Sequence, residues 1–183
     1  MIRVLMSCAL AITFLIGAGQ ACAAWEAELD DKKQVKAAKA IAAIQDRIPA
    51  SEKYFEDAYG FAILPSVTRL AVGFGGAYGG GIVVEGEEVI GTTGFWQFTS
   101  GIQGGVRNFS MILFFKDKQA LDHYKTGSLQ FLGQAGITLL TVGVVGTPAY
   151  NEGVAIVTVT RLGLMFELSY SGARFTYKPL IKD

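Results

Sequence analysis

The pattern of hydrophobic and polar residues predicts a helix near the start of the chain. Between residues 26 and 48, apolar side chains recur at steps of three and four, as they do on one face of a helix. Pro49 ends this pattern, and residues 51–58 predict a second short helix with Ser51 as its N-cap. The first helix carries five basic side chains on the side opposite its isoleucines: Lys32, Lys33, Lys36, Lys39 and Arg47.

From Phe61 onward the hydrophobic period changes to two, which is typical of strands. Residues 82–85 and 88–90 flank Gly86 and Glu87 and predict a hairpin. Residues 109–115 are almost wholly apolar and predict a central strand covered on both faces. Further short strands are predicted at 154–162, 164–170 and 175–177. One helix interrupts the series, with Asp117 as cap and Gly127 as stop.

Glycine is abundant and falls inside the strand pattern as well as in turns, with 23 residues in the chain. Such glycines mark bulges, bends or the close approach of two chain segments, and a strongly curved sheet needs them. The sequence therefore predicts one α+β domain. Its core is a strongly curved antiparallel β sheet, sandwich or barrel-like, with an N-terminal amphipathic helix and one short inserted helix. Residues 24–58 form the helical segment and residues 59–183 the glycine-rich β region.

The first 23 residues read as a signal peptide. Arg3 precedes an apolar run, and Ala21-Cys22-Ala23 fits the small-x-small rule for cleavage. An uncleaved membrane anchor is the alternative, although the run is short for a spanning helix. Both cysteines, Cys8 and Cys22, lie in this segment, so no disulfide is expected after cleavage. We expect an exported protein, periplasmic or peripherally attached to a cell-envelope membrane in a Gram-negative bacterium.

Charge argues against a nucleic-acid partner. Loss of Arg3 leaves 15 of the 16 basic side chains against 16 acidic ones, so any electrostatic function must come from local clustering. The glycine-rich stretch GFGGAYGGG, residues 73–81, matches neither the G-x-G-x-x-G fingerprint nor a P-loop. Both of those motifs lead into a helix, whereas this stretch leads into the apolar strand residues Ile82, Val83 and Val84.

No constellation of residues points to catalysis, a metal or a cofactor, and we expect a protein that is not an enzyme. His123 is the single histidine and lies on a predicted helix, where an exposed position is expected. The hairpin turn accounts for the paired carboxylates Glu87 and Glu88. Glu167 is expected to face outward on an amphipathic strand, with a position facing an interior cavity as the alternative.

Four ordered segments resemble the SYLF domain family of lipid-binding domains. The segment YGFAILPSVTRLAVGFGGAYGGG resembles the family stretch kGyAiFPSVtKaGfGiGGayGeG. TSGIQGGVRNFSMILFF, KQALDHYKTG and RLGLMFELSYSGARF resemble the later family segments in the same order. The resemblance covers about residues 50–178, which is nearly the whole mature domain.

This resemblance implies lipid binding without an established enzymatic activity. In eukaryotic members of the family an N-terminal basic amphipathic segment contributes to binding acidic phospholipids, and Lys32 to Arg47 could fill that role here. Arg69 occupies the position of the family's usual lysine after P-S-V-T. The expected partners are anionic phospholipids such as phosphatidylglycerol or cardiolipin, or the phosphates of lipid A. Protein partners are not indicated.

Three alternatives stay open at this point. The basic helix could simply pack its isoleucines on the sheet and leave its lysines in water. The sheet could enclose an apolar or lipid ligand, as a carrier does. An integral outer-membrane barrel fits the strand content, but the charged N-terminal helices and the ending Leu180-Ile181-Lys182-Asp183 are unusual for one.

Overall fold

The computed structural model describes residues 25–127, 130–132, 150 and 152–180. The predicted signal peptide, residues 1–23, lies outside the described residues. The elements in chain order are α1 (Lys32–Arg47), the 3-10 turn η1 (Pro49–Ser51), α2 (Glu52–Asp57), β1 (Gly60–Glu85), β2 (Glu88–Phe115), α3 (Lys118–Lys125), β3 (Gln130–Leu132) and β4 (Val154–Pro179).

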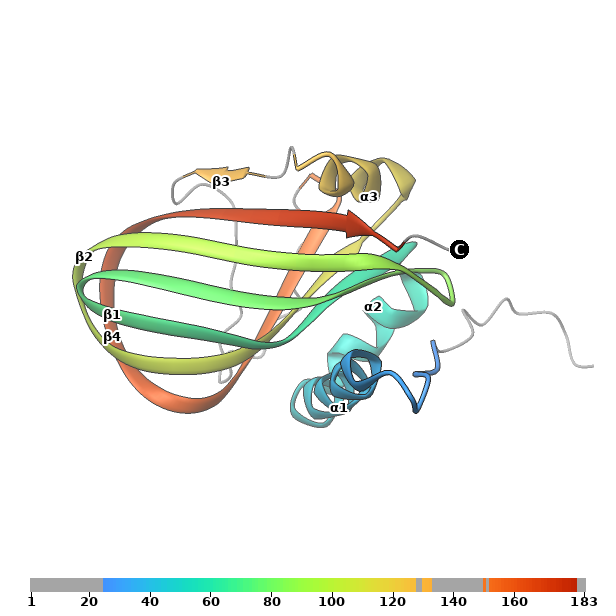
Figure 1. Ribbon diagram of the computed structural model, residues 1–183, viewed down its shortest axis with the longest axis horizontal. Helices are drawn as coiled ribbons and strands as arrows, with labels where there is room; N and C mark the ends of the chain where they lie inside the picture. The colour runs from blue at the N-terminus through green and yellow to red at the C-terminus, as the bar shows by residue number, and fades with distance from the viewer. Residues whose placement is uncertain (1–24, 128–129, 133–149, 151, 181–183) are drawn as a thin grey trace, which may run out of the picture.

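The strands form one antiparallel sheet in the order β1-β2-β4-β3, which confirms the α+β class. Three of the strands are very long, and each turns back at the same end of the molecule (Figure 1). The predicted barrel-like closure is wrong, because the sheet is open and has β1 and β3 at its edges. The expectation of many short strands is also corrected, since the segments predicted between residues 154 and 177 belong to the single strand β4.

Glycine allows the long strands to bend without losing their pairing. Gly73 has a φ of +73°, and the β1–β2 register shifts there, between Val72 and Phe74. On β2, Gly105 has a φ of +128° and stands opposite Ala71. Side chains other than glycine rarely adopt these angles, so the two glycines place the bend of both strands at the same level.

The two halves of β1 touch each other across the inner side of the bend. A Cβ added at Gly75 would lie 2.9 Å from the carbonyl oxygen of Leu70, and one added at Gly79 would lie 3.1 Å from Cα of Val67. At Gly81 an added Cβ would overlap the carbonyl oxygen of Ile63. These glycines therefore serve close backbone approach, as the sequence predicted for glycines inside strands.

Two buried clusters cover the two faces of the sheet. The inner cluster fills the space within the fold with large side chains such as Phe95 and Phe175, and Leu121 and Tyr124 of α3 pack into it. The outer cluster forms where α1 and α2 pack on the sheet around Phe114. The strand residues 109–115 contribute to both clusters and are all buried, which confirms the prediction of a central strand covered on both faces.

The helix α1 approaches the sheet through small side chains. Its buried residues are Gln34, Ala37, Ala40 and Ile44, so the buried face is rotated from the predicted stripe of isoleucines. Alanine allows a closer approach of the helix than isoleucine does, and Ile41, at the side of this buried face, is only half-buried. None of the described helices is long and apolar enough to cross a membrane.

The second helix is confirmed as α2, but its predicted cap is wrong. Ser51 lies in the helical region of φ and ψ and makes no capping hydrogen bond. The preceding turn η1 starts at Pro49 and places Ser51 in the interior, where it is fully buried. The cap prediction failed because the proline opened a turn of its own before α2.

A methyl group at Gly81 tests the close approach of the two halves of β1. We expect Gly81→Ala to lower the free energy of unfolding by about 1–3 kcal/mol or more, because the backbone of Ile63 must move to make room. Urea unfolding followed by circular dichroism measures this change.

The neighbouring glycine provides a matched control. A Cβ at Gly80 would meet its nearest atom, the carbonyl oxygen of Thr93, at 3.6 Å, which is an ordinary contact. We expect Gly80→Ala to change the unfolding free energy by about 0.5 kcal/mol or less. Equal stability of the two variants would contradict the contact between the halves of β1.

Candidate functional site

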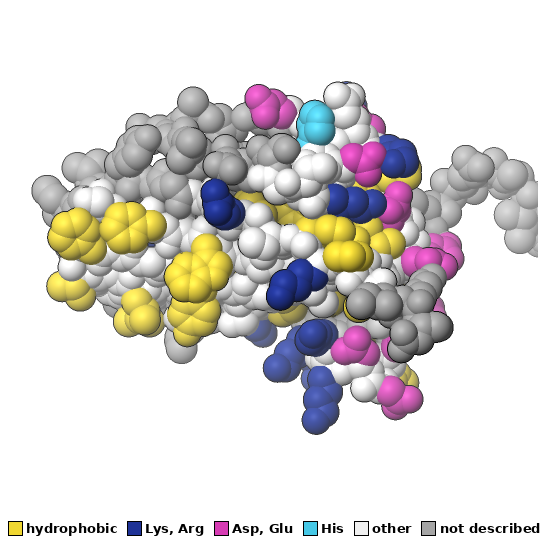
Figure 2. All heavy atoms as spheres, turned by 45° about the horizontal axis from the view of Figure 1, so that its top comes forward, with side chains coloured by type: hydrophobic (Ala, Val, Ile, Leu, Met, Phe, Trp, Pro, Cys, Tyr) yellow, Lys and Arg dark blue, Asp and Glu magenta, His cyan; other side chains and the backbone are white. Residues whose placement is uncertain are grey.

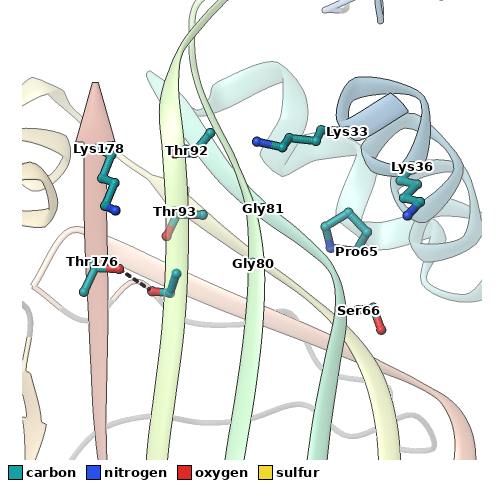
Figure 3. Close-up of a pocket in the computed structure, with 11 residues that line it drawn as sticks. Lys33, Lys36, Pro65, Ser66, Gly80, Gly81, Thr92, Thr93, Thr176 and Lys178 are labelled. Carbon is teal, nitrogen blue, oxygen red and sulfur yellow. Dashed lines mark hydrogen bonds between the residues drawn. The ribbon is translucent and has the colours of Figure 1, made fainter. Parts of the chain in front are cut away.

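A pocket of about 490 Å³ lies on the outer side of the sheet, beside the first turns of α1 (Figure 3). We call it the lysine pocket. Strands β1, β2 and β4 form its floor and α1 forms one wall. It is lined by Lys33, Lys36, Pro65, Ser66, Gly80, Gly81, Thr92, Thr93, Gly94, Thr176 and Lys178.

Three lysines from two distant parts of the chain meet at this pocket. Lys33 and Lys36 come from α1, and Lys178 comes from the end of β4. In Figure 3 the Lys33 side chain extends from the helix toward Thr92 across the pocket. Among the described residues that line the pocket, none is acidic. The pocket therefore concentrates positive charge in a protein whose formal net charge is zero.

The floor of the pocket exists because two glycines stand opposite each other. Gly80 of β1 pairs with Gly94 of β2, and neither places a side chain on this face. Thr176 of β4 pairs with Gly94 from the other side, and its hydroxyl donates to the Gly94 carbonyl oxygen at 3.4 Å. The Thr176 hydroxyl proton is used in that bond, whereas the Thr92 hydroxyl lines the pocket as a further donor, so the pocket combines ammonium groups with a hydroxyl group around an empty floor.

The positive charge comes from the lysine side chains and not from the helix terminus. Asp31 caps α1, and its carboxylate accepts hydrogen bonds from the backbone N–H groups of Lys33 at 2.7 Å and Gln34 at 3.4 Å. This carboxylate offsets the partial positive charge at the helix N-terminus. Any anion in the pocket would therefore be attracted mainly by the ammonium groups.

The structure brings together only some of the residues predicted as a site. Lys33 and Lys36 line the pocket. Lys32 and Lys39 are exposed on α1 but do not line it. The helical period alone places all these lysines on one side of α1. Only Lys33 and Lys36 lie close enough to the neighbouring sheet to line the pocket.

The two predicted arginines lie elsewhere. The guanidinium of Arg47 donates from Nη1 to the carbonyl oxygen of Thr160 at 2.7 Å, which ties the end of α1 to β4. Arg69 is buried, with 4% of its surface exposed, and its Nη1 donates to Oε1 of Gln97 at 3.3 Å. This burial removes Arg69 from the surface where we expected it to meet a phosphate group.

Sequence reasoning missed Lys178 as a site residue. The feature of the sequence that indicates Lys178 is the alternation in the last strand. There, one face of the strand carries Arg174, Thr176 and Lys178, and the other face carries Phe175 and Tyr177. That alternation predicts an outward basic row. It does not predict that this row lies beside α1, because the two segments are more than a hundred residues apart in the chain.

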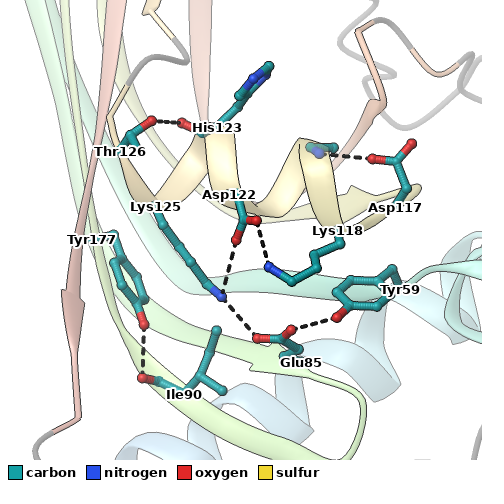
Figure 4. A network of polar contacts seen from close by, with 11 residues as sticks. Tyr59, Glu85, Ile90, Asp117, Lys118, Asp122, His123, Lys125, Thr126 and Tyr177 are labelled. Atoms are coloured by element: carbon teal, nitrogen blue, oxygen red, sulfur yellow. Dashed lines mark hydrogen bonds and ion pairs between the residues drawn. The ribbon is translucent and has the colours of Figure 1, made fainter.

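A second group of charges, the polar network, links α3 to β1 (Figure 4). Lys125 Nζ donates to Glu85 Oε2 at 2.9 Å, and the hydroxyl of Tyr59 donates to Glu85 Oε1 at 2.7 Å. Lys118 Nζ donates to Asp122 Oδ2 at 2.7 Å, and Lys125 also lies 3.8 Å from Asp122 Oδ1. The network holds the surface of α3 against the end of β1.

The pKa shifts in the polar network favour the ordinary charge states. The hydrogen bond from Lys125, then that from Tyr59, lowers the pKa of Glu85, and the hydrogen bond from Lys118 lowers the pKa of Asp122. The hydrogen bond to Glu85 raises the pKa of Tyr59, which keeps the phenol protonated. Both carboxyl pKa values are shifted away from neutral pH, as expected for an ion-pair network that stabilises the fold.

The single histidine, His123, is exposed on α3. Within residues 25–127, 130–132, 150 and 152–180, no group of three or more histidine, cysteine or acidic side chains could hold a metal ion. The lysine pocket is therefore the strongest candidate site in the part of the chain that the structure describes.

Comparison of the chain with protein-family models and with curated protein sequences finds no match. The resemblance to the SYLF family accordingly rests on the four sequence segments alone and stays a prediction.

The polar network predicts a pH-dependent contribution to stability. Because the pKa values of Glu85 and Asp122 are lowered by folding, their ion pairs stabilise the protein at neutral pH. This stabilisation is lost as the pH falls through those pKa values. We expect Lys125→Met to lower the unfolding free energy by about 1 kcal/mol or less at neutral pH, with the difference from wild type vanishing in acid.

Thermal or urea unfolding of both proteins over a series of pH values measures this effect. Lys116→Met, at an exposed lysine just before α3, is the control and should show a small difference that does not follow the same pH profile. A Lys125→Met difference that is constant with pH would contradict the role of the two carboxylates.

Proposed function

We propose that the protein is an exported, SYLF-like lipid-binding protein that associates peripherally with anionic phospholipid membranes. The observation that carries the proposal is the convergence of Lys33, Lys36 and Lys178 on one pocket. A lipid phosphate is a compact anion that ammonium and hydroxyl donors can bind together. The four segments that resemble the SYLF family support the same class of ligand independently of this geometry.

The size of the pocket suits a head group better than a whole lipid. A volume of about 490 Å³ lies within the range of small-molecule sites. The described residues that line it are glycine, threonine, serine, proline and lysine, and none of them is a large aliphatic or aromatic residue that would form a pocket for acyl chains. The chains of a bound lipid would therefore remain in the bilayer while the protein holds the phosphate.

The alternative of a carrier that encloses an apolar ligand has less support. The described part of the folded sheet has a packed inner cluster of buried side chains, including Phe95, Phe109 and Phe175. A carrier would need these rings to leave room for a ligand. Peripheral binding needs no change in the core, and it uses charges that are already at the surface.

Two pairs of lysines on α1 provide a test with a matched control. Lys33→Gln with Lys36→Gln removes two charges from the pocket, whereas Lys32→Gln with Lys39→Gln removes two charges from the same helix outside it. Each lysine near an anionic surface contributes about 1 kcal/mol, so the pocket pair should weaken binding by about thirtyfold. The control pair should weaken it much less.

The measurement is co-sedimentation of the processed protein, lacking residues 1–23, with phosphatidylcholine vesicles that contain or lack phosphatidylglycerol. We expect binding only to the anionic vesicles, with an affinity that falls as salt is added. Absence of binding to phosphatidylglycerol at low salt would overturn the proposal. An equal loss from both lysine pairs would show that the helix acts as a diffuse charge and that the pocket is not the site.

Filling the floor of the pocket is a second test that leaves the charges in place. Gly80 has room for a side chain at its Cβ and does not have a positive φ, so the strand should accept Gly80→Val. The valine would occupy the space between Lys33 and Thr176. We expect at least a tenfold loss of binding, with an unfolding free energy within about 1 kcal/mol of wild type. Full binding by a folded Gly80→Val protein would contradict the use of this pocket.

A further inference from the structure

Five large apolar side chains are exposed together on β1 and β2 near the bend of the sheet. We call them the apolar patch. Their exposed fractions are 89% for Val72, 69% for Phe74, 55% for Tyr78, 69% for Trp96 and 64% for Phe98. Figure 2 shows hydrophobic side chains gathered at one end of the molecule, with Lys and Arg side chains beside them. A contiguous exposed surface of this kind marks an interaction site.

The strand register makes the patch one surface and not a set of scattered residues. Tyr78 stands directly opposite Trp96, and Gly76 stands opposite Phe98. The rings of Phe74 and Phe98 stack with their centroids 6.4 Å apart. Cross-strand neighbours on the same face interact in this way, so the aromatic rings support one another at the surface.

The inward positions of β1 at the bend are occupied by small residues. The inward positions of β1 there are small, with Ala71 and Ala77 buried and Gly75 and Gly79 in contact with the other half of the strand. The large apolar side chains of this part of β1, Val72, Phe74 and Tyr78, stand at the outward positions. Core packing does not account for the apolar patch, because α1 and α2 cover a different part of the outer face.

The apolar patch is continuous with the lysine pocket. The pair Tyr78–Trp96 is followed on the same face by the pair Gly80–Gly94, which forms the pocket floor. Two residues along a strand correspond to about 7 Å. The aromatic rings and the ammonium groups therefore belong to one side of the molecule.

Basic side chains also run beside the patch on the neighbouring strand. Arg174 of β4 pairs with Trp96 and is exposed. Lys178, two outward positions further along β4, pairs with Thr92 and lines the pocket. The apolar patch is thus bordered on β4 by the cation Arg174 and continues into the cationic pocket.

We propose that the apolar patch inserts into the interfacial region of an anionic phospholipid bilayer while the lysine pocket holds a lipid phosphate. The inference rests on the proposed function and adds a second, apolar contact with the same membrane. Tryptophan and tyrosine favour the level of the head groups, and lysine and arginine are attracted to anionic lipids at that surface. An anionic bilayer is complementary to both parts of this face at once.

A second copy of the chain matches this face less well. A symmetric dimer would place the same surface of both subunits together. Arg174 beside the patch and the lysines of the adjoining pocket would then be present twice in or near one interface, and like charges disfavour that contact. Charge complementarity therefore favours an anionic bilayer over a second copy of the chain as the partner of this face.

The two tryptophans of the chain allow a direct test. Trp25 packs edge-on against Phe61, with ring centroids 6.2 Å apart, whereas Trp96 belongs to the exposed patch. In the processed Trp25→Phe protein, Trp96 is the single fluorescent indole. We expect its emission to shift to shorter wavelength on addition of phosphatidylglycerol vesicles and to be quenched by lipids with brominated chains. Trp96→Phe, which retains Trp25, should show little of either effect.

Affinity provides the second readout. Phe74→Ser with Phe98→Ser should weaken binding to the same vesicles by about tenfold or more, because two rings no longer leave water. Leu29→Ser with Leu180→Ser removes two exposed apolar side chains outside the patch and should have little effect. Circular dichroism establishes that each variant folds, and size-exclusion chromatography gives its oligomeric state.

The outcomes separate this inference from the proposed function. If wild type binds through Lys33 and Lys36 but Trp96 does not respond and the phenylalanine pair behaves like the leucine pair, insertion is overturned while lipid binding stands. If wild type does not bind anionic vesicles, both fail. If the phenylalanine pair abolishes a dimer in solution and leaves vesicle binding intact, the patch is an interface between copies, and insertion is overturned.

Discussion

The folded sheet requires the two halves of β1 to touch through their backbones. Three glycines on the inner side, Gly75, Gly79 and Gly81, leave no side chain in the way, and an added Cβ at each would meet atoms of the opposite half. Because the halves lie this close, the inward positions of β1 from Gly75 to Gly81 hold only glycine and alanine, and the large side chains of this segment stand at the outward positions. The same constraint that shapes the core therefore places aromatic rings at the surface.

The outer face of the sheet has three successive parts with different chemistry. The helices α1 and α2 cover the first part with a buried apolar cluster. The second part is the lysine pocket, where Gly80 and Gly94 leave an empty floor beside charged side chains. The third part is the exposed apolar patch near the bend. These three parts follow one another along the same strands. Their order is compatible with the proposed binding to an anionic bilayer.

Glycine has two different roles within the stretch from Gly73 to Gly81. The positive φ of Gly73 and the contacts of Gly79 and Gly81 serve the bend of the chain. Gly80 faces outward and leaves the floor of the lysine pocket open simply by lacking a side chain. The stretch runs along a strand and does not lead into a helix, which confirms the prediction that it leads into the strand residues Ile82 to Val84. Sequence inspection did not indicate that one glycine of the stretch would line a cationic pocket.

The sequence by itself determined the elements whose pattern is local. The helix from Lys32 to Arg47 and the hairpin around Gly86 follow from the period of apolar residues and from turn chemistry, because backbone geometry fixes those periods. Only the tertiary structure decided that Lys33, Lys36 and Lys178 meet, that Arg69 is buried, and that the sheet stays open. These features depend on the bend and register of strands of 26 and 28 residues, and therefore on contacts between residues far apart in the chain.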